Sequence, residues 1–236
     1  MPRWFKSVEV LPHEAPFSAA LLRELGLRGI HCGSARNIHP GCLNTDLLRI
    51  RERDGRATER GRLALVDERI YFLEHDSTEP YPVEDGSFEW AYSEHFIEHL
   101  TLDEAIAWLR EILRVLAPGG LVRVSTPSLA LYLRGYVDPR HEFFVARREV
   151  MRGMRVFRER EIPERDAWMV NNLFYQWDHQ WLYDLDELRH VLVEAGFDPD
   201  SVAERRFRES GIDEAGALDL EGRAYQSVYA EACKPG

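Results

Sequence analysis

Two segments of the chain place apolar residues along one face of a helix. In the first, Thr101 and Glu104 form a capping box, and apolar residues then recur at intervals of three and four until Pro118. The second begins at Asp184, and its apolar face ends at Gly196, a residue typical of helix ends. We therefore predict helices over residues 102–116 and 185–195, and a shorter one near residues 17–25.

Short apolar runs between and around these helices indicate strands. They cover residues 30–32, 43–50, 70–73, 88–92, 121–125, 202–207 and 227–232. Because the runs alternate with helices, they are typical of βαβ units and a mostly parallel sheet. The sequence therefore predicts the α/β fold class.

The length of 236 residues suits a single domain, residues 1–236, with room for one elaboration. No apolar run approaches the roughly 20 residues of a membrane span, and the N-terminal residues do not form a signal peptide. The three cysteines, Cys32, Cys42 and Cys233, show no CxxC spacing, so neither a disulfide framework nor a zinc knuckle is indicated. We expect a cytoplasmic protein.

Charge is distributed unevenly along the chain. The formal net charge of -11 argues against broad nucleic-acid binding, which needs a basic surface. Within residues 134–160, however, eight arginines stand against four acids. This run is either a solvated helical face or a local site for an anionic acceptor such as a phosphate or carboxylate.

Residues 128–181 fit no regular crossover between strands. The stretch is rich in aromatic residues, and structureless loops of this length are uncommon, so we predict a partly helical insertion. It lies beyond the carboxyl end of a strand, where open α/β sheets bind ligands. A lid or acceptor-binding subdomain is the functional interpretation, and a packed structural subdomain is the alternative; the two are compatible.

Three residues at strand ends suit a nucleoside ligand. Gly33 ends the first strand in a turn where glycine lets the backbone approach a ligand closely. Asp46 ends the next strand, where a carboxylate can accept two hydrogen bonds from a ribose diol. Asp76 follows the third strand and suits the amino group on an adenine edge.

Taken in order, these motifs resemble the class I S-adenosylmethionine-dependent methyltransferases, and in particular their short bacterial methyltransferase-domain branch. The resemblance covers residues 28–127 closely and residues 181–233 loosely. Its further motifs lie at residues 44–46, 85–93, 94–100, 116–121 and 125–127. It implies a Rossmann-like, mostly parallel seven-stranded sheet with helices on both faces and an inserted lid after the fifth strand.

The resemblance also implies a cofactor, S-adenosyl-L-methionine, with S-adenosyl-L-homocysteine as its product. The residues expected to bind the cofactor are Cys32, Gly33, Ser34, Asn44, Asp46, Asp76, Ser77, Ser93 and Glu94. The chain departs from the family pattern where His31 replaces an acid and where Ala35 replaces a second glycine. Glu94 is therefore a candidate for holding the methionyl ammonium group.

Methyl transfer needs in-line positioning, exclusion of water and, for a hydroxyl or ammonium acceptor, a base. Histidine titrates nearest to neutrality, so the candidate catalytic residues are His95, His179 and His141. A structural hydrogen bond is the alternative role for each. We expect a small-molecule or glycan acceptor, anionic or aromatic, methylated on oxygen or nitrogen, and we assign no metal ligand.

Three other functions are consistent with parts of the sequence. His95, Glu98 and His99 match the HxxEH pattern of inverted zinc peptidases, although no third ligand is evident. Glu98, His99 and His179 resemble part of the metal site of small-RNA 2′-O-methyltransferases. A non-catalytic cofactor-binding module is the third alternative, and the acidic chain favours a small acceptor over RNA.

Overall fold

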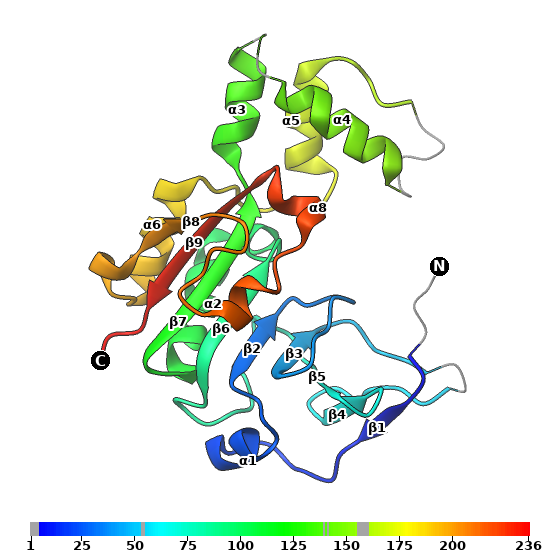
Figure 1. The fold of residues 1–236 in the computed structure, drawn as a ribbon, viewed down its shortest axis with the longest axis vertical. Helices are drawn as coiled ribbons and strands as arrows, with labels where there is room; N and C mark the ends of the chain where they lie inside the picture. The colour runs from blue at the N-terminus through cyan, green and yellow to red at the C-terminus, as the bar shows by residue number, and fades with distance from the viewer. Residues whose placement is uncertain (1–4, 53–54, 139, 141, 155–160) are drawn as a thin grey trace.

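One nine-stranded sheet organises the chain in a computed structural model that describes every residue except 1–4, 53–54, 139, 141 and 155–160 (Figure 1). The strand order is β1-β4-β5-β3-β2-β6-β7-β9-β8. The strands are β1 (Val8–Val10), β2 (Gly29–Cys32), β3 (Cys42–Asp46), β4 (Leu63–Val66), β5 (Ile70–Glu74), β6 (Phe88–Glu94), β7 (Leu116–Pro127), β8 (Ala203–Arg205) and β9 (Ser227–Cys233).

The α/β prediction is confirmed, but the prediction of seven mostly parallel strands is wrong in both number and direction. The five strands β5-β3-β2-β6-β7 are parallel, whereas both flanks of the sheet are antiparallel. The unpredicted strands β1 and β4 have three and four residues, too few for a periodic pattern. The turn from β4 into β5 places Asp67 and Glu68 at positive φ without the glycine or asparagine that marks such turns.

The chain reverses its direction of travel across the sheet at the boundary between β2 and β6. From β2 it continues to β3 on one side, and from β6 it continues to β7 on the other. Because these strands are parallel, their carboxyl ends share one edge of the sheet. Ligands of open α/β sheets bind at the edge where such a reversal occurs.

The three predicted helices form and cover one face of the sheet. They are α1 (Ala19–Glu24), α2 (Leu102–Val115) and α6 (Leu185–Ala195). Thr101 and Glu104 exchange both capping-box hydrogen bonds, and Gly196 ends α6 with a φ of 106°. Their apolar faces join the strands in the largest core cluster, which includes Leu109 and Leu192. No helix among the described residues has both the length and the apolar character to cross a membrane.

Helices cover the second face of the sheet less than predicted. There, Trp90 and Tyr92 of β6 pack against Leu218 and against Ala215 of the four-residue helix α7 (Asp213–Gly216). The β2–β3 crossover, residues 33–41, contains no helix. This crossover is too short for a helix, so the prediction of helices on both faces holds only in part.

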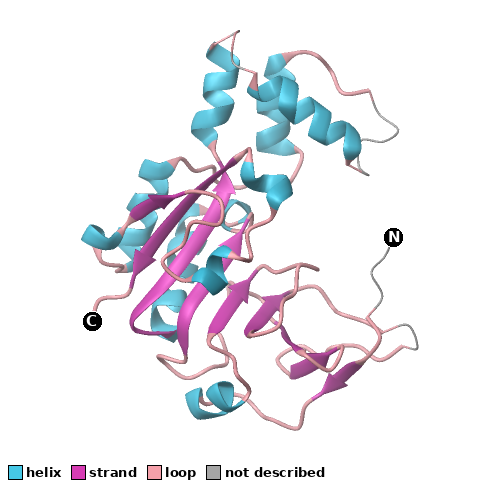
Figure 2. Ribbon diagram, viewed as in Figure 1, coloured by secondary structure: helices cyan, strands magenta, loops and turns pink. Residues whose placement is uncertain are grey.

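The predicted insertion contains three helices beyond the ends of the strands (Figure 2). They are α3 (Leu129–Val137), α4 (Phe143–Gly153) and α5 (Asp166–Tyr175). Apolar residues of these helices, including Tyr132, Phe144 and Met169, form a separate core cluster. The insertion therefore has packing of its own and adds a wall above the carboxyl edge of the sheet.

Arg123 of β7 carries a buried charge network. Its guanidinium, with no exposed surface, donates to Asp219 Oδ1 at 3.0 Å and to Glu231 Oε1 at 3.0 Å. It also donates to the backbone oxygens of residues 206 and 209. This one side chain therefore ties the segment leading to α7 against the sheet.

We predict that Arg123→Met lowers the free energy of unfolding by about 3–5 kcal/mol, because it leaves two carboxylates buried without their cation. Arg205→Met is the matched control, since Arg205 pairs with the same Glu231 but is a third exposed. Arg205→Met should lower the free energy of unfolding by less than about 1 kcal/mol. Urea unfolding of both variants measures the difference, and equal losses would show that the network is not what stabilises this segment.

Candidate active site

Two cavities lie at the carboxyl edge of the parallel strands. The first, about 300 Å³, is lined by residues that include Gly33, Asp46, Asp76 and Phe96; we call it the Asp46 cavity. The second, about 180 Å³, is lined by residues from the strand ends and from the insertion; we call it the Arg147 cavity. His99 lines both. The two cavities are therefore neighbours with one shared residue.

Backbone hydrogen bonds hold the carboxylate of Asp46 in the first cavity. Its Oδ2 accepts from the Ala35 amide at 2.8 Å, and its Oδ1 accepts from the Leu48 amide at 2.7 Å. Each carboxylate oxygen has two lone pairs, so both keep a further acceptor position. The side chain is thus oriented and still able to bind a ligand hydroxyl.

Asp76 is held in a similar way across the same cavity. Its Oδ1 accepts from the Thr78 amide at 3.0 Å and from the Thr78 hydroxyl at 2.7 Å. These bonds lower the pKa of Asp76, so it is ionised at neutral pH. Its Oδ2 lies 3.9 Å from Arg60, which leaves that oxygen able to accept from a ligand amino group. Ser77 lines the cavity next to it and accepts from the Tyr81 hydroxyl at 2.8 Å.

Gly33 is required by the protein's own packing. Its φ is +63°, and a Cβ there would lie 2.6 Å from the ring of Phe96. Phe96 also lines the Asp46 cavity. The close approach at Gly33 in this structure is therefore to an aromatic side chain, and the approach to a ligand that the sequence indicates stays a prediction.

The structure places five of the expected cofactor-binding residues behind the walls of the cavities. Cys32, Ser34, Asn44, Ser93 and Glu94 are each at most 4% exposed, and none lines either cavity. The Asn44 amide donates to three backbone oxygens, so it holds the loop before β3. Glu94 accepts from the Leu220 amide and lies 3.5 Å from Arg223, and burial raises its pKa to about 7.

His31, which replaces the usual acid, is buried beside Tyr92. Burial lowers its pKa to about 3, so the ring is neutral. A neutral buried imidazole cannot form an ion pair with a ligand ammonium group. The departure from the family pattern is thus a packing feature of the sheet.

His95 follows β6 and lines the Arg147 cavity, with a φ of 53° that is rare outside glycine. Its Nε2 lies 2.7 Å from Ser227 Oγ, and that hydroxyl donates its one hydrogen to the Arg223 carbonyl at 2.8 Å. Nε2 must therefore carry a hydrogen and donate, which leaves Nδ1 as a bare acceptor. Burial lowers the pKa of His95 well below its ordinary value.

His179 lines the same cavity and has a similarly fixed tautomer. Its Nδ1 lies 2.6 Å from the Leu173 carbonyl, so Nδ1 donates and Nε2 is bare. Burial and the neighbouring His99 lower its pKa to about 4. His95 and His179 thus meet in one cavity, whereas His141 lies outside the described residues.

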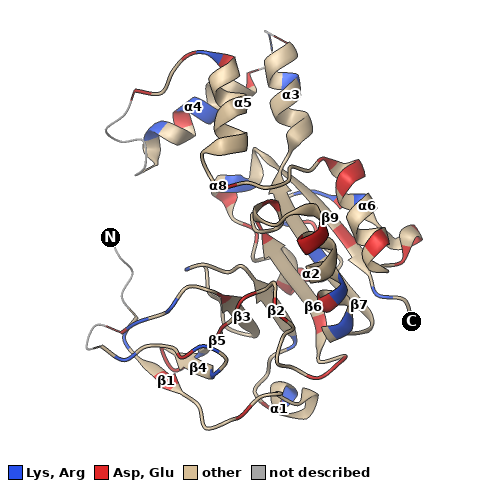
Figure 3. Ribbon diagram, turned by 180° about the vertical axis from the view of Figure 1, so that it is seen from behind, with Lys and Arg blue, Asp and Glu red and all other residues tan. Residues whose placement is uncertain are grey.

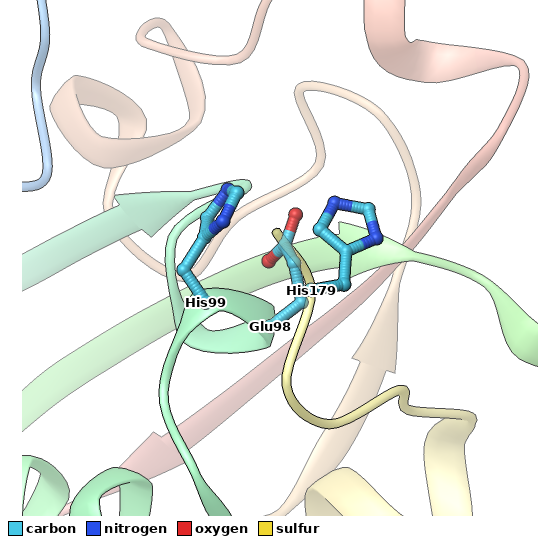
Figure 4. A group of neighbouring side chains, drawn as sticks. All are labelled: Glu98, His99 and His179. Atoms are coloured by element: carbon cyan, nitrogen blue, oxygen red, sulfur yellow. The ribbon is translucent and has the colours of Figure 1, made fainter. Parts of the chain in front are cut away.

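The HxxEH pattern does not lie on an α-helix. His95 has left-handed backbone geometry, and Glu98 and His99 belong to the three-residue 3-10 helix η1 (Ile97–His99). His95 and His99 therefore cannot share a helix face as a zinc peptidase requires. The structure instead groups Glu98 and His99 with His179 (Figure 4). Burial raises the pKa of Glu98 to about 7.

The arginine-rich run divides into exposed and buried members. Arg140 and Arg152 on the run are exposed, as a solvated face predicts. Arg147 and Arg148 of α4 are 4% and 5% exposed. Arg148 pairs with Asp166 at 2.6 Å, whereas Arg147 has no acidic partner among the described residues and donates to the Tyr225 hydroxyl at 2.6 Å. Its Nε has no hydrogen-bond partner.

Comparison with known families agrees with the resemblance seen in the sequence. Residues 48–124, about a third of the chain, match the family described as "Methyltransferase domain". Over these residues the chain is similar to that family, in agreement with the resemblance of its sequence motifs. The match is consistent with S-adenosylmethionine, the cofactor expected from the sequence. A search of curated proteins finds no match.

Solved structures similar to this chain include several methyltransferases. A Thermotoga maritima protein described as a possible histamine N-methyltransferase shares 15% identity over 88% of this chain and 81% of its own, with a TM-score of 0.46. A methyltransferase of Archaeoglobus fulgidus shares 14% over 92% of both chains, with a TM-score of 0.46. Phosphoethanolamine N-methyltransferase 2 of Haemonchus contortus shares 14% identity over 92% of this chain, with a TM-score of 0.46. The match covers 52% of that longer chain. At these scores none of the likenesses bears on the acceptor.

The sequence does not single out two residues that line the cavities, Arg147 and Phe96. In the sequence, Arg147 is one of eight arginines within residues 134–160. Only its burial in the structure distinguishes it from the exposed arginines of that run. Phe96 lies between two motif residues, and its apolar side chain gave no chemical signal. The position of both side chains depends on how distant segments of the chain pack together, which cannot be read from a single sequence.

We predict that Gly33→Ala destabilises the protein more than Gly41→Ala does. Both glycines have positive φ, but a Cβ at Gly41 would meet nothing within 4 Å. Both variants therefore incur backbone strain of about 1–2 kcal/mol, and Gly33→Ala adds overpacking of about 1–3 kcal/mol against Phe96. Free energies of unfolding measure the gap, and equal losses would mean that Phe96 does not press on Gly33.

Proposed function

We propose that this enzyme binds S-adenosylmethionine in the Asp46 cavity and transfers its methyl group to a small-molecule or glycan acceptor in the Arg147 cavity. The observation that carries the proposal is the joining of two cavities through His99. One is lined by two strand-end carboxylates, and the other by the partly buried His95 and His179 and the buried Arg147. Methyl transfer needs a donor site and an acceptor site in contact, because the reaction is an in-line displacement.

The donor site would use the residues that line its cavity. Asp46 accepts hydrogen bonds from the ribose hydroxyls, and Asp76 accepts from the adenine amino group, with Ser77 beside it. The methionyl part lies over Gly33, so the ring of Phe96 has to turn away from the glycine when the cofactor enters. Cys32, Ser34, Asn44, Ser93 and Glu94 support this site from behind.

Arg147 supports an anionic acceptor. A buried guanidinium without a counter-ion carries a large desolvation cost, which a ligand phosphate or carboxylate would offset. Its unpartnered Nε and its Nη1, which faces the Tyr225 hydroxyl, provide donors at the cavity. The insertion would thus recognise the acceptor as well as cover it.

His95 is the proposed base. Its bare Nδ1 takes the proton of an acceptor hydroxyl or ammonium group as the bond from sulfur to the methyl carbon breaks and the bond from that carbon to the acceptor forms. The carboxyl group of Glu98 is the acidic group beside this nitrogen, with its Oε1 3.7 Å from Nδ1. His179, with a bare Nε2 in the same cavity, is the second candidate.

RNA fits this chain less well than a small acceptor. The net charge is -11, and Figure 3 shows acidic positions on α6 as well as the basic positions on α4. Arg147 is buried, so it can meet a single anionic group inside the cavity but adds no exposed basic surface for a nucleic-acid backbone. We therefore propose no nucleic-acid partner.

We predict that Asp46→Ala weakens binding of S-adenosylmethionine and S-adenosylhomocysteine at least about tenfold, or about 1.4 kcal/mol. The reason is the loss of both ribose hydrogen bonds. Asp85→Ala is the control, because Asp85 is also acidic but its side chain is 78% exposed and distant from the cavity lining. Titration calorimetry of the wild type, Asp46→Ala and Asp85→Ala measures the two affinities. Equal affinity for wild type and Asp46→Ala would place the ribose elsewhere.

We predict that Arg147→Met raises the KM for the acceptor at least about tenfold and leaves S-adenosylmethionine affinity unchanged, since charge-assisted bonds to an acceptor anion contribute about 1.5–3 kcal/mol. Arg152→Met removes an exposed arginine from the same helix and should have no effect. The assay uses a panel of phosphorylated, carboxylated and neutral acceptors.

Turnover of neutral acceptors that is insensitive to Arg147→Met would contradict an anionic acceptor. Cofactor binding without turnover of any acceptor in the panel would support a non-catalytic module instead.

A further inference from the structure

Glu98, which lines the Arg147 cavity, has one buried carboxylate oxygen without a hydrogen-bond partner in the part of the chain that the structure describes. The side chain has no exposed surface, and its Oε2 accepts from the Thr126 hydroxyl at 2.9 Å. Its Oε1 has no hydrogen-bond partner among the described residues. A buried oxygen of this kind is costly unless a donor or a cation reaches it.

The end of the insertion brings His179 to this oxygen. The amides of Gln180 and Trp181 donate to the backbone carbonyl of Glu98 at 2.7 and 3.3 Å. These bonds fix the position of the neighbouring His179 relative to Glu98, although some eighty residues separate the two in sequence. The Leu173 carbonyl binds His179 Nδ1, so Nε2 is the nitrogen left with a lone pair.

His99 completes a group of three ligand atoms. One ligand atom each from Glu98, His99 and His179 lies within 4.8 Å of the others. Figure 4 shows the carboxylate of Glu98 between the two imidazole rings. Metal bonds of about 2.0–2.2 Å need the ligand atoms somewhat closer than this, by about an ångström. The ring of His99 is exposed and packs edge-on against the ring of His179, with the centroids 5.0 Å apart, so binding an ion would require it to shift by this amount.

We propose that Glu98, His99 and His179 bind one divalent first-row transition-metal ion at the junction of the two cavities. The arrangement has the features of a prepared metal site: a carboxylate and an imidazole, each held by a hydrogen bond to its other polar atom, which leaves the ligand atom bare. Three protein ligands leave open positions for a ligand or water.

The ligand chemistry selects the class of ion. Two imidazole nitrogens and one carboxylate oxygen suit Zn²⁺, Co²⁺, Fe²⁺ or Mn²⁺ better than Mg²⁺ or Ca²⁺, which prefer all-oxygen sites. Neutral imidazoles are required, and the lowered pKa values of His99 and His179 agree with that.

The site itself does not depend on the proposed function, but its use does. An ion there lies next to both the donor cavity and the acceptor cavity, because His99 lines both. It would bind an oxygen of the acceptor and hold it toward the methyl group. A hydroxylated acceptor is then the class that the site favours.

The experiment titrates chelator-treated, S-adenosylmethionine-free protein with Co²⁺ and follows the visible absorption of the bound ion, with Zn²⁺ calorimetry alongside. We expect saturable one-to-one binding that Glu98→Gln and His179→Ala each weaken at least about 100-fold. His190→Ala, which removes an exposed histidine from α6, is the matched control and should bind like wild type.

Absence of one-to-one binding by wild type, or equal affinity in His179→Ala and His190→Ala, would overturn the metal site. Circular dichroism of each variant confirms folding, and Glu98→Gln preserves side-chain shape if His179→Ala does not fold. Asp46→Ala should bind Co²⁺ normally. If Asp46→Ala loses affinity for the cofactor but still binds Co²⁺, the metal site and the donor site are separate sites.

Discussion

The parallel pairing of β2 with β3 on one side and β6 on the other is the constraint on which the site depends. The register sets Cys32 opposite both Thr45 and Ser93, so the strands end level with one another. Gly33 and His95 come directly after the ends of β2 and β6, and Asp46 is the last residue of β3. The pairing continues beyond β3, where the His75 amide donates to the Asp46 carbonyl, and this brings Asp76 to the same edge. The side chains that line the Asp46 cavity depend on that register for their positions.

The insertion and the strand ends together line the Arg147 cavity. Its far end is joined to the site through the amide–carbonyl bonds from Gln180 and Trp181 to Glu98, and α4 contributes the buried Arg147. The insertion and the carboxyl edge of the sheet are therefore joined by hydrogen bonds. This arrangement places the proposed acceptor site beside the proposed donor site.

The sequence predicted α1, α2 and α6, the five parallel strands, and that Asp46 and Asp76 lie at strand ends, because each has a local signal: a helix cap or apolar face, an apolar run, or an acid after a strand. It did not predict β1 and β4, whose three and four residues are joined to the sheet by an unmarked turn. It also did not separate Asn44, which binds the backbone, from Asp46, which faces the cavity. Which way a side chain points depends on packing between segments distant in sequence, and one sequence does not record it.

The most direct measurement is a crystal structure of the protein with S-adenosylhomocysteine bound. The account predicts the ribose on Asp46, the adenine amino group at Asp76, Phe96 turned away from Gly33, and the sulfur directed toward the Arg147 cavity. A nucleoside bound at another edge of the sheet, or a ligand whose sulfur points away from His95 and Arg147, would contradict it.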